Sequence, residues 1–147
     1  MNLITKTLAI GLLLVGGVAY AEGDATDANA IARETLMKTV GMNTKVLGDM
    51  AGDKAAFDAA AATAAKAAIA EAAGKIAATF ETQGGADPTS EVKPDIWTNW
   101  ADFLTKADGL ATAAAAVDVA SLEGVKAGMA GLGGACKACH TTYRVQQ

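Results

Sequence analysis

The sequence predicts an all-α fold, an antiparallel four-helix bundle that forms one domain. Alanine, leucine and methionine are frequent and clusters of β-branched residues are few, a composition that favours helix nearly everywhere. Four segments repeat apolar residues at three- and four-residue steps, the period of an amphipathic helix. One break is long, the segment 83–90, which contains two glycines and a proline. Four helices with short connections and one long crossover are typical of a bundle.

The first predicted helix runs from about Ala28 to Met50 and ends at Ala51-Gly52, since glycine is a common helix stop. The second begins after Asp53, a suitable N-cap, and continues to about Phe80. Alanines on the second helix would let a neighbouring helix approach closely. The expected apolar stripes are Ile31, Met37, Val40, Thr44 and Leu47 on the first helix, and Phe57, Ala61, Ala64, Ala68, Ala72 and Ile76 on the second.

The third predicted helix starts at Pro94, which is tolerated in a first turn, and runs to about Val117. It contains both tryptophans, which we expect to be packing anchors. The fourth helix spans about Val119 to Arg144, and its spacing places both cysteines on the buried side. The two stripes are Trp97, Trp100, Leu104, Ala107, Leu110 or Ala111 and Ala114, and then Leu122, Val125, Met129, Leu132, Cys136, Cys139 and Tyr143.

The segment Cys136-Lys137-Ala138-Cys139-His140 holds both cysteines and the only histidine of the chain. It has the Cys-x-x-Cys-His form of a covalent haem attachment site. Residues three apart share a helix face, so Cys136 and Cys139 can each form a thioether with one haem vinyl group. His140 then lies beneath the iron, where a neutral imidazole is a good proximal ligand. The motif predicts one covalently bound haem in the bundle core.

Three other interpretations of these residues are open. A tetrahedral zinc site needs four ligands, and after two cysteines and one histidine only carboxylates remain to complete it. A redox dithiol normally lies at a helix N-terminus that follows a strand, whereas this motif lies near the end of a helical pattern. A structural disulfide would leave His140 without a role.

The N-terminus predicts export. Lys6 precedes an apolar run from Leu8 to Val18, and Ala19-Tyr20-Ala21 has the form cut by signal peptidase. We expect residues 1–21 to be a signal peptide and residues 22–147 to be the haem domain, without a membrane anchor. Covalent attachment of haem c takes place outside the cytoplasm, so the two predictions agree. In a bacterium the compartment is the periplasm.

The chain is acidic. Its formal charge of −4 becomes −5 when Lys6 is removed with the signal peptide. An acidic balance argues against nucleic acid as a partner. It suits a periplasmic redox partner protein that presents a complementary basic patch.

Three further segments bear on the identity of the fold, residues 33–38 (RETLMK), 93–97 (KPDIW) and 133–144 (GGACKACHTTYR). Together they resemble the cytochrome c' family, the class II c-type cytochromes. The resemblance covers nearly all of the chain after the signal peptide. Residues 36–41 and 43–48 are more similar to the low-spin, Met/His-ligated branch than to the gas-binding branch.

The resemblance implies roles for several further residues. Arg33 stands where a family arginine reaches the haem propionates, although an isolated arginine would be read as an exposed helix cation. Glu34 replaces a common glutamine that can contact the haem edge, and Trp97 is expected to pack near the cofactor. Arg144, four residues after His140, is expected to tune the proximal pocket or to favour the helix C-terminus electrostatically.

Met37 matches the distal residue of the family, and two geometries lead to two functions. If its sulfur reaches the iron, the haem is six-coordinate and low-spin, which suits an electron carrier. If it only covers an open distal face, small gases such as NO or CO can bind. Core packing alone is the third reading of this methionine.

The leading prediction is therefore an exported electron-transfer protein that cycles between Fe(III) and Fe(II), and is not an enzyme. Gas binding at a five-coordinate haem is the alternative. A peroxidase would need a distal acid-base group, and the one histidine is already assigned to the proximal side. The resemblance also implies a homodimer through the first two helices.

Overall fold

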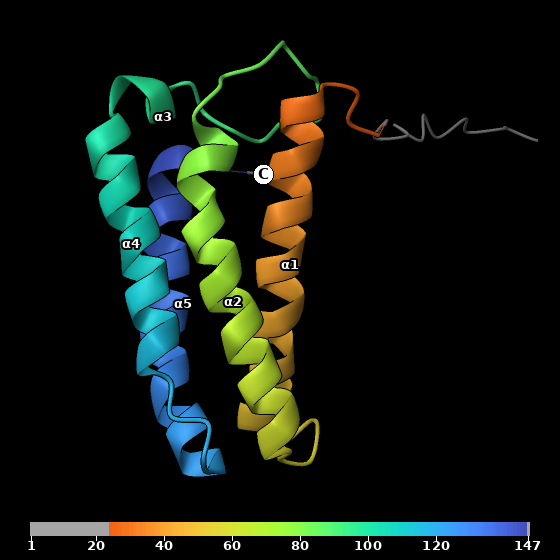
Figure 1. The fold of residues 1–147 in the computed structure, drawn as a ribbon, viewed down its shortest axis with the longest axis vertical. Coiled ribbons are helices and arrows are strands. Elements are labelled where there is room, and N and C mark those ends of the chain that lie inside the picture. The colour runs from red at the N-terminus through yellow and green to blue at the C-terminus, as the bar shows by residue number, and fades with distance from the viewer. Residues whose placement is uncertain (1–23, 147) are drawn as a thin grey trace, which may run out of the picture.

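The computed structural model describes residues 24–146 and places five helices in them. The long helices lie side by side as an antiparallel bundle, and α3 is a single turn at one end (Figure 1). Neighbouring pairs are α1 with α2, α2 with α4, α4 with α5, and α5 with α1. The predicted four-helix bundle is confirmed. The elements are α1 (Ala28–Ala51), α2 (Ala59–Phe80), α3 (Asp95–Thr98), α4 (Trp100–Ala116) and α5 (Leu122–Tyr143).

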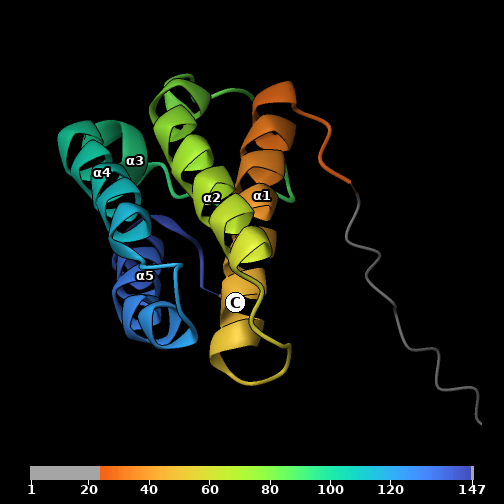
Figure 2. The same ribbon diagram turned by 60° about the horizontal axis from the view of Figure 1, so that its bottom comes forward.

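The two ends of the bundle differ in their connections. At one end, which we call the crossover end, α1 begins, α2 and α5 finish, and the long connection 81–94 leads to α3 (Figures 1 and 2). At the other, the loop end, short segments join α1 to α2 and α4 to α5. The predicted signal peptide, residues 1–21, lies outside the described residues. Among residues 24–146, no helix is both long and apolar enough to cross a bilayer.

Helix α1 has the predicted bounds. The Asp27 carboxylate caps it by accepting hydrogen bonds from the amides of Asn29 and Ala30, each at 3.0 Å. The inward face follows the predicted steps through Val40 and Leu47, but Ile31 is 44% exposed, so its place in the stripe was wrong. The buried face passes through Ala30 and Arg33 instead, and one residue is a rotation of about 100° on a helix.

Helix α2 begins later than expected, because Asp58 and not Asp53 is its N-cap. The Asp58 carboxylate accepts from the amides of Ala60 and Ala61 at 2.9 and 3.0 Å. Asp53 lies in the preceding loop with a φ of 56°, a left-handed conformation that aspartate tolerates better than most residues. Its carboxylate instead forms an ion pair with Lys126 of α5, at 3.1 Å.

The buried stripe of α2 also differs from the prediction in its first half. Ala72 and Ile76 are buried as expected, whereas Ala64 is exposed. Alanine occupies so many positions that the period alone does not distinguish the faces, and the larger Ile69 and Phe80 decide which face turns inward. The buried residues are Ala62, Ala65, Ile69, Ala72, Ala73, Ile76 and Phe80.

The third predicted helix is interrupted. Asn99, with φ −120° and ψ 41°, separates α3 from α4, so the expected continuous helix from Pro94 was wrong at this point. The carbonyl of Asn99 then accepts the amide of Phe103 at 3.0 Å and starts α4. The break allows both Ile96 and Phe103 to be buried, each with 2% exposure. Trp97 and Trp100 pack at the edge of this core.

Helix α5 agrees with the prediction within a few residues. The Ser121 hydroxyl caps it by accepting the amide of Gly124 at 3.1 Å. Val125, Leu132 and Tyr143 are buried, and both cysteines pack against the core cluster, as the spacing predicted. Arg144 lies just beyond the helix in an extended conformation, with φ −108° and ψ 139°. It therefore does not share a helix face with His140.

Candidate functional site

Cys136, Cys139 and His140 lie in the last two turns of α5, at the crossover end. Both thiols are half-buried, are not joined in a disulfide and pack against the core cluster. Burial raises the pKa of each thiol. A redox dithiol needs thiols with a lowered pKa, so this environment argues against that interpretation. It suits two sulfurs that become neutral thioethers on one helix face.

His140 is half-buried beside them. Burial lowers the pKa of the imidazole, the charge of Arg144 lowers it further, and the charge of Glu91 opposes both. The neutral form, which is the one that binds iron, is thereby favoured. The carbonyl of His140 accepts the Arg144 amide and the Gln146 side chain, both at 3.1 Å. These bonds fix the end of the helix that carries the histidine.

Arg33 is the one charged side chain that is buried among residues 24–146, with 5% exposure. Its Nη2 donates to the carbonyl oxygens of Gln83, at 2.8 Å, and Thr82 at the start of the crossover. Its guanidinium lies over the rings of Trp97 and Phe80, 5.1 and 5.6 Å from their centroids. Burial lowers the pKa of this arginine, and the charge of Asp27 opposes the shift. The reading of Arg33 as an exposed cation was wrong.

One donor of Arg33 remains without a partner. Its Nε is buried and makes no hydrogen bond to any residue between 24 and 146. An unpaired buried donor is costly unless a ligand satisfies it. A propionate carboxylate of a bound haem has the chemistry to do so, which fits the role implied for this residue.

Arg33 and Trp97 line a hollow of about 480 Å³ together with the crossover. The indole of Trp97 donates to the carbonyl of Phe80 at 2.8 Å, which fixes the ring at the edge of the core. The predicted packing role of Trp97 near a cofactor stays a prediction. The other lining residues are Gln83, Gly85, Ala86, Asp87, Pro88, Ser90, Val92 and Pro94.

Met37 and Glu34 differ in their surroundings. Met37 is half-buried and packs against the core cluster, one turn after Arg33 on α1, which is a neighbour of α5. Glu34 is exposed on the same helix. The structure therefore places Met37 on the inner side of the bundle. The exposure of Glu34 gives no support to the expected contact of this residue with a haem edge.

Two carboxylates hold the crossover on the beginning of α1. Asp87 accepts the amides of Thr26 and Asp27 at 2.7 and 2.9 Å, and Asp27 accepts the amide of Gly85 at 3.0 Å. These hydrogen bonds lower the pKa of both aspartates. Gly84 has a φ of 77°, and a Cβ there would lie 2.7 Å from Asp27 Oδ1, so glycine is required.

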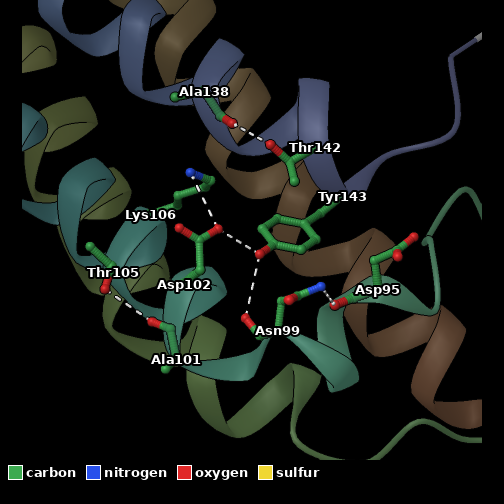
Figure 3. A network of polar contacts seen from close by, with 9 residues as sticks. All are labelled: Asp95, Asn99, Ala101, Asp102, Thr105, Lys106, Ala138, Thr142 and Tyr143. Atoms are coloured by element: carbon green, nitrogen blue, oxygen red, sulfur yellow. Dashed lines mark hydrogen bonds and ion pairs between the residues drawn. The ribbon is translucent and has the colours of Figure 1, made fainter.

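A polar network joins α4 to the end of α5, close to the motif (Figure 3). The buried Tyr143 hydroxyl donates to Asp102 Oδ2 at 2.6 Å, and Lys106 pairs with the same oxygen at 3.3 Å. Burial and the bond to Asp102 raise the pKa of Tyr143 to about 12. Lys106 and Asp102 also act on the pKa of the Cys139 thiol, in opposite directions. This network therefore lies beside the second attachment cysteine.

Sequence reasoning missed Asp102, Lys106 and Glu91. Glu91, in the crossover, forms an ion pair with Arg144 at 2.5 Å. An acid in a loop and two charges on an exposed helix face carry no local signal of such contacts. Only the pairing of distant segments reveals them.

The described residues fit a covalent haem. Two half-buried thiols share one face of α5, a half-buried imidazole follows them, and a buried arginine offers an unpaired donor at the same end of the bundle. Among residues 24–146, no cluster of three or more His, Cys, Asp or Glu side chains is placed to hold a metal ion.

Comparisons with known proteins agree with this fit. The sequence model of the family described as Cytochrome C' matches residues 29–144. The chain is 35% identical to cytochrome c-556 of Agrobacterium fabrum, over 100% of this chain and 97% of that protein. It is 33% identical to cytochrome c' of Rhodopseudomonas palustris, over 100% of this chain and 99% of that protein.

A solved structure of cytochrome c' from Rhodopseudomonas palustris has the same fold, with a TM-score of 0.72 and 31% identity. The match covers 81% of this chain and 97% of that one. Fold, motif and relatives together decide between the interpretations of the Cys-x-x-Cys-His segment. The chain belongs to the cytochrome c' family, and it carries one covalently attached haem c.

Proposed function

We propose that this chain is an exported electron-transfer protein, with His140 as the proximal and Met37 as the distal ligand of its haem iron. When bound, the haem supplies a one-electron couple between Fe(III) and Fe(II). The chain's own residues contribute the axial ligands, the burial and the nearby charges, which together set the reduction potential.

The position of Met37 carries this proposal. It is half-buried on the inner side of α1, one turn after the buried Arg33, and α1 packs beside the helix that carries His140. A thioether is a known axial partner of histidine in c-type cytochromes. If the Met37 sulfur binds, it would keep the iron six-coordinate in both oxidation states, and little reorganisation would be needed when an electron arrives or leaves.

Optical spectra of the purified holoprotein test this ligation. We expect sharp low-spin bands in the ferric and ferrous forms, with no change when carbon monoxide is added to the ferrous form. Met37→Ala should give high-spin bands and prompt binding of carbon monoxide. Met42→Ala is the matched control, because Met42 lies on the same helix with 55% exposure, and it should behave as the parent does.

A parent protein with broad high-spin bands that shift promptly with carbon monoxide would contradict electron transfer through a Met/His site. The function would then be the binding or buffering of small gases, NO or CO, at a five-coordinate haem.

The partner and the compartment are part of the proposal. The acidic chain, with formal charge −4, suits a periplasmic redox partner that presents a basic patch. Electron transfer to such a partner should slow as ionic strength rises. Mass spectrometry of periplasmic protein should find a chain that starts near Glu22, and a chain that retains residues 1–21 would contradict export.

We also propose that the chain is not an enzyme. Its one histidine is assigned to the proximal side, so the distal side lacks the usual acid-base group of a peroxidase. Oxidation of an organic dye by hydrogen peroxide should be no faster with the holoprotein than with an equal amount of free haem.

A homodimer through α1 and α2 is supported by the outer face of α1. Ile31, Met42 and Val46 are 44%, 55% and 37% exposed, and steps of eleven and four residues bring them to one side of the helix. The outer side of α2 is mostly alanine, which permits close approach. Light scattering after size-exclusion chromatography should give the dimer mass, and Val46→Lys should give monomer.

A further inference from the structure

The crossover is paired with the chain that follows α5, and this pairing brings together Glu91 and Arg144. An isolated β-bridge joins Val92 to Arg144. The amide of Val145 donates to the Glu91 carbonyl at 2.7 Å, and the amide of Lys93 donates to the Tyr143 carbonyl at 2.9 Å. Backbone hydrogen bonds therefore hold the crossover beside the residues at the end of α5.

The two side chains continue this alignment. Arg144 Nε donates to Glu91 Oε2 at 2.5 Å, and Nη2 lies at the same distance from that oxygen. Two nitrogens of the planar guanidinium against one carboxylate oxygen restrict its orientation. Arg144 and Glu91 are 48% and 32% exposed, so solvent screens the pair without removing its field. The pair is thus an ordered, nearly neutral unit.

This unit lies next to His140. Arg144 directly follows the last residue of α5, and its amide donates to the His140 carbonyl at 3.1 Å. Glu91 is the other member of the ion pair. Both charges are therefore held at the end of the helix that carries the proximal ligand.

We propose that Glu91 is a positioning residue of the iron site, which holds the Arg144 guanidinium in place and balances its charge beside His140. The proposal rests on the assignment of His140 as proximal ligand of a redox haem, and not on whether Met37 is bonded. An unbalanced cation would favour ferrous over ferric iron and raise the reduction potential, and an unbalanced anion would lower it. The ion pair keeps these two effects in balance.

Potentiometric titration of the purified holoprotein at low ionic strength tests this role. Glu91→Gln should raise the reduction potential, because Arg144 loses its counter-charge. Arg144→Gln should lower it, because Arg144 then no longer balances the negative charge of Glu91. The double variant should return close to the parent. Arg144→Lys keeps the charge and should stay nearer to the parent than Arg144→Gln does.

The opposite signs separate this role from a purely structural one. Breaking a structural link from either side removes the same contact, so both single variants would shift the potential in the same direction. The control is the ion pair of Asp53 with Lys126, at 3.1 Å, which also joins a loop to α5 but near the loop end. Asp53→Asn and Lys126→Gln should leave the potential unchanged.

Shifts of equal sign, no shift in either variant, or equal shifts in the control pair would overturn the proposal. The outcomes for the proposed function are distinct. High-spin spectra with opposite-sign shifts would remove electron transfer through Met37 and retain the role of Glu91. Low-spin spectra with shifts of equal sign would retain electron transfer through Met37 and remove the role of Glu91. A parent without a reversible iron couple would remove both.

Discussion

The two ends of the bundle bury their surface in different ways. At the crossover end, four aromatic rings are in contact, with centroids of Phe80, Trp100 and Tyr143 lying 5.3, 5.4 and 5.5 Å from that of Phe103. The side chain of Arg33 is also buried at this end, and one of the four rings, that of Tyr143, carries a hydroxyl group. At the loop end, a hollow of about 470 Å³ between α4 and α5 is lined by small residues, alanines and glycines, together with Asp118.

This difference indicates where the fold is generic and where it is specialised. The loop end needs only caps and close helix packing, which many sequences could provide. The crossover end places polar groups inside the protein, and a buried polar group that loses its partner is costly. Its hollow is lined by Arg33 and Trp97, and the haem-binding segment ends there. Substitutions at the two ends should therefore have different consequences.

The largest effect is expected from Arg33→Ala. Two carbonyls of the crossover lose their donor and two rings lose a cation, so the free energy of unfolding should fall by about 2–3 kcal/mol. The matched substitution at the loop end is Lys66→Ala, which removes one bond to the Val117 carbonyl at 2.8 Å and should cost about 1 kcal/mol. Urea unfolding measures both, and equal losses would contradict the comparison.

Gly128→Ala should show the close packing of the loop end. A Cβ at Gly128 would lie 3.0 Å from three atoms of Val117, so we expect a loss of about 1–3 kcal/mol. The control is Gly109→Ala on α4, where an added Cβ meets nothing within 4 Å and should stabilise the helix by about 0.5–1 kcal/mol. Thermal unfolding of the two variants should shift in opposite directions.

Tyr143→Phe removes only the hydroxyl that binds Asp102, and should cost about 1 kcal/mol at neutral pH. The pKa of Tyr143 is raised from 10.0 to about 12, so the folded state holds this proton more tightly than the unfolded state. The resulting stability is complete below pH 10 and is lost as the pH rises toward 12. Urea unfolding between these values should show a smaller alkaline loss for the variant.

The smallest effect is expected from Asp87→Asn, a partly buried residue whose pKa is lowered from 3.8 by hydrogen bonds from backbone amides and the Thr89 hydroxyl. A lowered pKa gives stability that is present above pH 3.8 and disappears as the pH falls below it. The variant should therefore lose less stability than the parent on acidification. Acid titrations followed by circular dichroism would show this, and identical curves would contradict a role for the aspartate.

The sequence predicted the helices well where one residue type decides a boundary. Gly52 ends α1 as expected, because its local chemistry suffices. The prediction from sequence failed where two residues compete to cap the same helix, as Asp53 and Asp58 do at the start of α2. It failed again on α2, where uniform alanine leaves the orientation to contacts with other helices, and at Asn99, where burial of Ile96 and Phe103 favours a break.

The haem motif and the family were determined by the sequence alone, because thiols three residues apart on a helix share a face in any environment. The partners of that motif were decided by tertiary structure. Arg33 and Gln83 are 50 residues apart, Tyr143 and Asp102 are 41 apart, and Arg144 and Glu91 are 53 apart. Such pairs depend on the register of whole helices and on the path of the crossover, and no local pattern encodes them.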